Sequence, residues 1–86
     1  MSLADELLGA VGGPENVASL THCWARLRFE LHDVDAVDEP RVRAQPEVAL
    51  AVHQHAQYQV VLRTALLETY GDLASLIHQH QEVPRD

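Results

Sequence analysis

The sequence predicts an α+β domain, in which a four-stranded antiparallel sheet carries three helices on one face in the order α-β-β-α-β-β-α. Apolar residues recur at helical spacing near both ends of the chain, and residues 25–31 alternate between apolar and charged side chains. Two pairs of short apolar segments are each joined by a short connection, which is typical of hairpins. At 86 residues the chain is one small domain. We expect this domain to span residues 1–80, with 81–86 as a tail or the start of a linker.

The first helix is expected over residues 3–11. Its apolar face is formed by Leu3, Leu7, Leu8 and Val11. Ser2 and Asp5 have the spacing of a capping box, with aspartate in place of the usual glutamate. The run Gly12-Gly13-Pro14 ends the helix, because glycine suits a left-handed cap and proline does not continue a helix.

Two further helices are expected later in the chain. A short one covers residues 39–44, where Pro40 suits the first turn. A longer one covers residues 65–80, with Thr64 as its candidate N-cap. The apolar stripe of this last helix is formed by Leu66, Leu67, Tyr70, Leu73, Ala74 and Ile77.

The four strands are expected as two hairpins. Residues 17–21 and 25–31 form the first, and residues 48–53 and 57–63 form the second, with Gln54-His55-Ala56 as its connection. In the second strand, one face carries Leu27, Phe29 and Leu31 and the other carries Arg26, Arg28 and Glu30. This alternation indicates a half-buried strand with one polar face.

The charge pattern excludes some partners. The formal net charge is -7, and the six basic residues are all arginines, so the chain is a poor candidate for binding nucleic acid. Its single cysteine excludes an internal disulfide and favours a reducing compartment. No run is long and apolar enough to span a bilayer. Four arginines form two Arg-x-Arg pairs, of which Arg41 and Arg43, on the short helix, are expected to be solvated.

The strongest chemical signal is Cys23, which is followed closely by Arg26 and Arg28. Cys23 falls between the first two predicted strands, where a connection would expose it. A thiolate is a good nucleophile, and paired guanidinium groups bind a dianion well. These residues together suggest a thiol that carries a phosphoryl group. A lone cysteine in a small domain is more often an inert, buried residue, and the local pattern leaves that alternative open.

Four segments of the chain occur in the order found in a known family. They are Gly12-Gly13-Pro14-Glu15-Asn16-Val17, Ser19-Leu20-Thr21-His22-Cys23, Arg26-Leu27-Arg28-Phe29 and Gln57-Tyr58-Gln59-Val60-Val61. With them the chain resembles the enzyme IIB domain of the bacterial sugar phosphotransferase system, of the glucose/β-glucoside/sucrose type. The resemblance covers roughly residues 3–75, and the stretch from Leu20 to Phe29 is its most specific part.

The resemblance implies both a fold and a reaction. The fold is a four-stranded antiparallel sheet with helices on one face. Cys23 would take a phosphoryl group from a histidine of a phosphorylated IIA domain and pass it to a sugar held by the membrane IIC domain. Arg26 and Arg28 would bind the phosphoryl group, so neither a metal nor a cofactor is invoked. The expected location is cytoplasmic, at the inner face of the membrane as part of a permease, and the sugar stays open.

Residues around the cysteine and several histidines are further candidates. His22 is a candidate phosphoryl-binding residue, because it could tune the thiol or contact phosphate. Trp24 is either an exposed aromatic for partner docking or a core residue. The runs His53-Gln54-His55 and His78-Gln79-His80 suggest metal ligands, but without a second cysteine or matching carboxylates we interpret them as surface histidines.

Three positions depart from the family pattern. Ala25 stands where the family usually has threonine, the hairpin containing His55 is usually rich in glycine, and Arg63 stands where a glycine commonly follows the strand. We include Ala25, His55, Gln57 and Arg63 as possible contacts, with Arg63 near the site if the second hairpin faces Cys23. These departures support an alternative function, a regulatory or interaction module of the same fold with weak or no phosphotransfer.

Overall fold

The computed structural model describes residues 2–81. Its four strands are β1 (Val17–Cys23), β2 (Arg26–Leu31), β3 (Val48–Gln54) and β4 (Gln57–Leu62). Its α-helices are α1 (Leu3–Ala10), α2 (Glu39–Arg43) and α3 (Leu66–Gln81). The strands form one antiparallel sheet in the order β1-β2-β4-β3. The predicted fold class is therefore confirmed.

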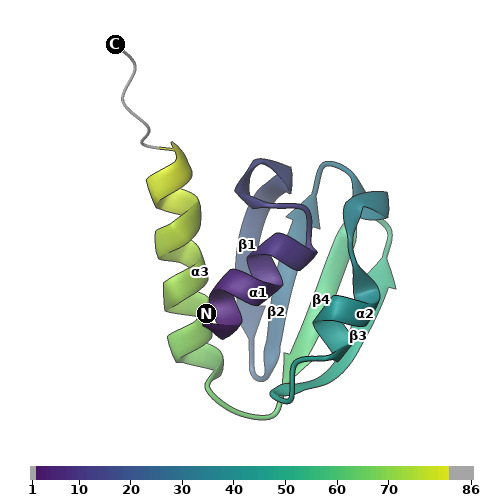
Figure 1. The fold of residues 1–86 in the computed structure, drawn as a ribbon, viewed down its shortest axis with the longest axis vertical. Helices are drawn as coiled ribbons and strands as arrows, with labels where there is room; N and C mark the ends of the chain where they lie inside the picture. Colours follow the sequence, from purple (N-terminus) through teal and green to yellow (C-terminus); the bar gives the residue numbers. More distant parts are fainter. Residues whose placement is uncertain (1, 82–86) are drawn as a thin grey trace.

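The helices leave one face of the sheet uncovered. Figure 1 shows α1 and α2 lying across one face, with α3 along the β1 edge on the same side. We call the uncovered side of the sheet the open face. No helix within residues 2–81 is long and apolar enough to cross a membrane. Residues 82–86 lie outside the described part of the chain, so the expected tail and the domain limits stay predictions.

The alternation along β2 decides which side chains enter the core. Leu27, Phe29 and Leu31 are at most 4% exposed and face the helices, together with fully buried Tyr58 and Val60 of β4. Because neighbouring residues of a strand point to opposite faces, the polar residues between them lie on the open face. The predicted polar face of this strand is thus the open face.

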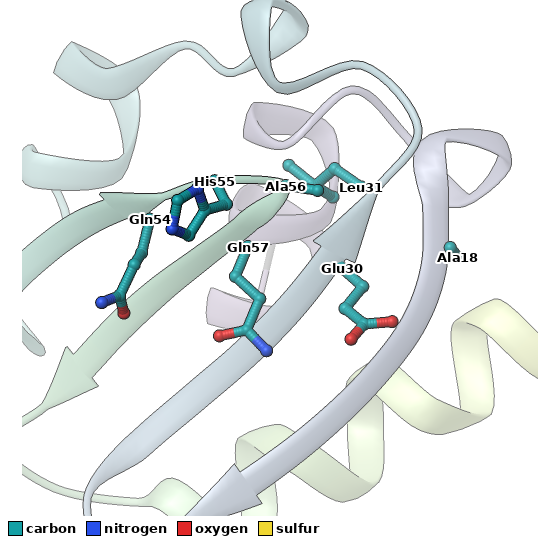
Figure 2. Close-up of a pocket in the computed structure, with 7 residues that line it drawn as sticks. All are labelled: Ala18, Glu30, Leu31, Gln54, His55, Ala56 and Gln57. Atoms are coloured by element: carbon teal, nitrogen blue, oxygen red, sulfur yellow. The ribbon is translucent and has the colours of Figure 1, made fainter.

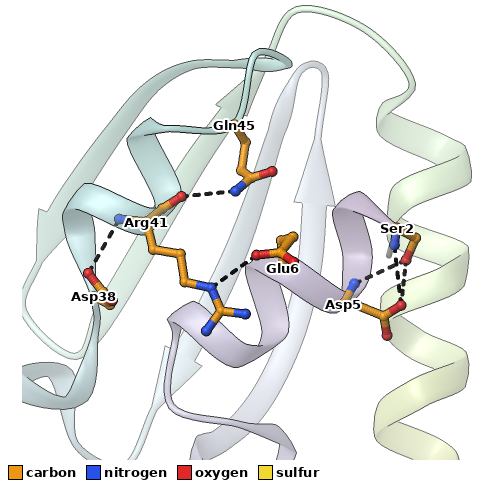
Figure 3. Close-up of polar contacts among 6 residues, drawn as sticks. All are labelled: Ser2, Asp5, Glu6, Asp38, Arg41 and Gln45. Carbon is orange, nitrogen blue, oxygen red and sulfur yellow. Dashed lines mark hydrogen bonds and ion pairs between the residues drawn. The ribbon is translucent and has the colours of Figure 1, made fainter.

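The capping box of α1 forms as expected. The Ser2 hydroxyl accepts a hydrogen bond from the backbone N–H of Asp5 at 3.2 Å, and the Asp5 carboxylate accepts one from the backbone N–H of Ser2 at 3.4 Å (Figure 3). The helix ends at Ala10, and Gly12 and Gly13 follow with φ of 106° and 88°. These left-handed angles explain the glycine pair, because other residues adopt them only with strain.

Arg41 is not the solvated residue that the sequence suggested. Its Nε lies 3.1 Å from Oε1 of Glu6, so it forms an ion pair that ties α2 to α1 (Figure 3). Arg43 pairs within α2, with Nη2 at 3.7 Å from Oε2 of Glu39. The expectation was wrong for Arg41 because the path of the chain brings the two helices together, which local sequence does not reveal.

The predicted apolar stripe of α3 is only partly confirmed. Leu73 is fully buried, but Leu67 is 69% exposed, and the small side chain of Ala74 is also exposed. The polar Thr69 is instead buried. The helix lies at the edge of the sheet and packs against α1 and β1, so only a narrow line of its residues meets the core.

The start of α3 also differs from the prediction. Ala65, with φ of 60°, precedes the helix, and its carbonyl accepts the hydrogen bond from the backbone N–H of Thr69 at 2.9 Å. Ala65 therefore occupies the N-cap position, and the proposed cap by Thr64 was wrong.

Candidate functional site

Cys23 is the last residue of β1 and not part of a loop. The strand extends two residues beyond the predicted end, and the turn consists of Trp24 and Ala25 alone. Cys23 pairs with Arg26 directly across this turn. A two-residue turn keeps the strands paired up to its edge, so the thiol is half-buried and held by the sheet. The carbonyl of Ala25 accepts a hydrogen bond from the backbone N–H of Leu62 at 2.8 Å, which anchors the turn to β4.

Strand register brings the nucleophile candidate and both arginines onto the open face. Cys23 stands opposite Arg26, and Thr21 stands opposite Arg28. Paired residues of an antiparallel sheet point to the same side, with Cβ atoms about 5 Å apart. Cys23, Arg26 and Arg28 therefore form one cluster, as their spacing predicted.

Arg26 is held in this cluster by a glutamine. Its Nη1 donates a hydrogen bond to Oε1 of Gln59 at 2.7 Å, and Gln59 is only 5% exposed although it lies on the open face. Gln59 was not among the site residues expected from the sequence. The signal was present, because Gln57 and Gln59 are two residues apart in one strand and must share a face.

The positive charge of the cluster has no negative partner in the described structure. Within residues 2–81, neither Arg26 nor Arg28 forms an ion pair. Arg28 is half-buried, and its Nε is buried without a hydrogen-bond acceptor among the described residues. In a chain of net charge -7, two uncompensated guanidinium groups beside a thiol make a local site for an anion.

His22 does not join the cluster. It is the neighbour of Cys23 on one strand, so its side chain points to the opposite face of the sheet. There its ring lies 4.5 Å from the ring of Tyr70 in a T-shaped contact. The structure therefore places His22 against α3 and away from the thiol, which contradicts the geometry expected of a phosphoryl-binding residue.

The turn between β3 and β4 lies at the end of the sheet opposite Cys23, so it does not face the thiol. The backbone N–H of Leu31, at the end of β2, donates to the carbonyl of Ala56 at 3.0 Å, whereas Cys23 lies beside the start of β2. His55 is therefore distant from the thiol, and the expected contact is wrong. Gln57 also lies at this end, where Figure 2 shows it beside Gln54 and His55 at a surface pocket.

Three residues lie at the same end as Cys23. Trp24 is 93% exposed, so the core-packing alternative is wrong and its indole is available to a partner. Ala25 completes the turn and is also exposed. Arg63 follows β4 at this end, but it lines a hollow with Arg43 on the β3 side, which places it beyond the Cys23 cluster.

The histidine runs bring no metal cluster together in the described structure. The ring of His53 lies 4.8 Å from the ring of Tyr58. Within residues 2–81, no group of three histidine, cysteine or acidic residues is positioned to hold a metal ion. The chemistry available at the site is that of a thiol and two guanidinium groups.

The sequence matches proteins of one transport system. Residues 5–38 match the family described as phosphotransferase system, EIIB. The arbutin-, cellobiose- and salicin-specific EIIBC component of Escherichia coli is 32% identical over 76 residues, which cover 88% of this chain and 16% of that protein. The β-glucoside-specific EIIBCA component of Dickeya chrysanthemi is 36% identical over 75 residues, or 87% of this chain and 12% of that protein. The chain thus spans less than a fifth of these relatives.

A solved structure agrees with the sequence comparisons. A crystal structure of one domain of the phosphotransferase IIabc component from Clostridium difficile superposes with a TM-score of 0.72 at 25% identity. The match covers 98% of this chain and 90% of that one, so the likeness extends to the whole fold. The relatives, the matching fold and the Cys23 segment lead to one conclusion: the chain belongs to the enzyme IIB domain family of the bacterial sugar phosphotransferase system.

Proposed function

We propose that this domain carries a phosphoryl group on Cys23, between a phosphorylated histidine of a IIA domain and a sugar held by a membrane IIC domain. The observation that supports this most directly is the pairing of Cys23 with Arg26 across the turn, where no carboxylate of residues 2–81 forms an ion pair with the arginine. The relatives are named as EIIBC and EIIBCA components, which supports IIA and IIC as partners. The domain would then work at the cytoplasmic face of the membrane.

The transfer proceeds in two displacements. In the first, the Cys23 thiolate attacks the phosphorus, a P–S bond forms, and the P–N bond to the histidine breaks as the imidazole leaves. In the second, a sugar hydroxyl attacks the phosphorus, the P–S bond breaks, and the thiolate is restored while the hydroxyl proton is released. Arg26 and Arg28 stabilise charge on the non-bridging oxygens in both steps, which is the main contribution that a protein makes to phosphoryl transfer.

A phosphorylation assay tests this function. Incubation with phosphoenolpyruvate, the general phosphotransferase proteins and a IIA domain should add the mass of one phosphoryl group to the chain. Cys23→Ser should abolish that adduct, whereas His22→Gln should retain it, because His22 faces α3. An adduct that survives Cys23→Ser would assign the acceptor to a histidine. A chain that stays unmodified while iodoacetamide alkylates its native thiol would support the interaction-module alternative.

A further inference from the structure

We infer that Gln59 is a positioning residue, which fixes the Arg26 guanidinium beside Cys23 without neutralising its charge. The inference deepens the proposed function and rests on it, since Arg26 acts there on the phosphoryl group. Gln59 lies on β4, two residues along the sheet from the level of Cys23, and does not contact the thiol. It acts through Arg26. Its contribution is the direction in which the guanidinium points.

The contact between the two side chains is diagonal across the strands. Arg26 stands opposite Val61 of β4, and Gln59 is two residues earlier on the same face. Diagonal neighbours lie within reach of long side chains, and the bond from Nη1 to Oε1 is short, at 2.7 Å. Arginine has only donors, so the amide must present its oxygen to Arg26.

Two further amides fix the orientation of Gln59. Its Nε2 donates to Oε1 of Gln57 at 3.0 Å and to Oε1 of Gln54 at 3.4 Å. Figure 2 shows Gln54 and Gln57 extending from β3 and β4 to the same side of the sheet. With its nitrogen engaged on that side and its side chain 5% exposed, Gln59 has one orientation that satisfies all three bonds.

The choice of a neutral acceptor is the informative feature. The two other arginines of the described fold with side-chain partners, Arg41 and Arg43, pair with the carboxylates of Glu6 and Glu39. Arg26 alone is held by an amide. A carboxylate would hold the guanidinium equally well, but it would cancel the charge that an incoming phosphoryl group requires. An amide supplies orientation and leaves the charge in place.

The test measures the electrostatic field at Cys23 in the isolated domain, without partners. Iodoacetate is an anion and iodoacetamide is neutral, so the ratio of their alkylation rates reports the positive charge at the thiol. We expect Arg26→Gln to lower this ratio by about fivefold, from the loss of a unit charge about 6 Å from the thiol at intermediate dielectric. Gln59→Glu should lower it by about threefold, because its carboxylate offsets the charge of Arg26 from farther away. Gln59→Leu should lower it by about twofold, because Arg26 is then free to move into solvent.

Gln45→Leu is the matched control. It removes another amide, which bonds to the carbonyl of Arg41 on α2, and it should leave the ratio unchanged. Circular dichroism and thermal unfolding establish that each variant is folded. If Gln59→Leu unfolds, the near-isosteric Gln59→Glu still tests the role of Gln59.

Two outcomes would overturn the inference, and they differ in what else they affect. If Arg26→Gln lowers the ratio while both Gln59 variants keep it, Gln59 does not position Arg26, and the proposed function stands. If Arg26→Gln also leaves the ratio unchanged, Arg26 does not act on Cys23, and the phosphoryl clamp of the proposed function is lost as well.

Discussion

Gly9 lies directly beneath the guanidinium of Arg41. A Cβ on Gly9 would come within 2.8 Å of Nη2 and 2.9 Å of Nη1, which is closer than packed atoms approach. Because Gly9 has no side chain, Arg41 can pass over α1 at this position and reach Glu6. Gly71 of α3 offers a comparison, because a Cβ there would meet nothing within 4 Å.

Replacing these two glycines by alanine should have different effects. Gly71→Ala should raise the free energy of unfolding by about 1 kcal/mol, the usual difference in helix propensity. Gly9→Ala should raise it less, because Arg41 must leave Glu6 to make room. In an Arg41→Ala background, Gly9→Ala should recover the full gain. Urea unfolding of the four variants measures this, and equal gains for Gly9→Ala in both backgrounds would contradict the contact.

Tyr58 should make the fold sensitive to alkaline pH. Burial and, to a lesser extent, the carboxylate of Glu39 together raise the pKa of Tyr58 to about 12, against an opposing effect of Arg43. The folded state therefore holds the phenol proton more tightly than the unfolded chain, whose tyrosine titrates near pH 10. The resulting stability is complete below pH 10 and is lost as the pH rises from 10 to 12, by about 2 kcal/mol.

Urea unfolding between pH 8 and 11 measures the size of this effect. Tyr58→Phe should remove most of the decline, because no buried proton remains to be lost. Tyr70→Phe should keep the decline. A wild-type curve that runs parallel to that of Tyr58→Phe over this range would show that Tyr58 is not responsible.

The turn of the second hairpin contains removable strain. His55 has φ of 58°, which costs a residue with a side chain about 1 kcal/mol relative to glycine. His55→Gly should raise the melting temperature, by an amount reduced somewhat by the added freedom of the unfolded chain. Ala56→Gly has no positive φ to relieve and should lower it. Thermal unfolding of both variants decides, and a stabilising Ala56→Gly with a neutral His55→Gly would reverse the assignment.

Arg28 should lower the free energy of unfolding of the domain. Its Nε is buried and has no acceptor among the described residues, and such a donor costs about 1 kcal/mol or more. Arg28→Met keeps the length of the side chain and removes the donor, so the free energy of unfolding should rise by about 1 kcal/mol while phosphoryl transfer to sugar falls. Arg43→Met removes an exposed arginine with a weak ion pair and should change stability little. If both substitutions lower the free energy of unfolding equally, the buried Nε of Arg28 does not destabilise the fold.

The sequence predicted the sheet well because its signal is local. The alternation of Leu27 and Phe29 with two arginines is visible within six residues, and it placed the arginines on one face. The same alternation, applied across β1, separates His22 from Cys23, yet the expectation for His22 followed their adjacency in the chain. Gln59 was overlooked for the same reason, because its partner Arg26 lies on another strand.

The position of His55 depended on strand order, which local pattern does not contain. In a simple meander the two hairpin turns would lie at the same end of the sheet, and His55 would be near Cys23. Here β2 pairs with β4, and β3 is at the edge. This order reverses the direction of the second hairpin, so the connection between β3 and β4 lies beside Leu31. The chain reaches β3 through the connection containing α2, which buries Val42 in the core and pairs Arg41 with Glu6 far back in the sequence.

The open face has a consequence for how such a domain diverges. Residues that secure the helices and residues of the open face alternate along the same strands but point to opposite sides of the sheet. Substitutions of Gln54 or Gln57 on this face therefore need not disturb Phe29 or Tyr58, which are fully enclosed. The residues that maintain the fold and the residues available for recognition lie on opposite sides of one sheet. The same fold can therefore present different surfaces to different partners.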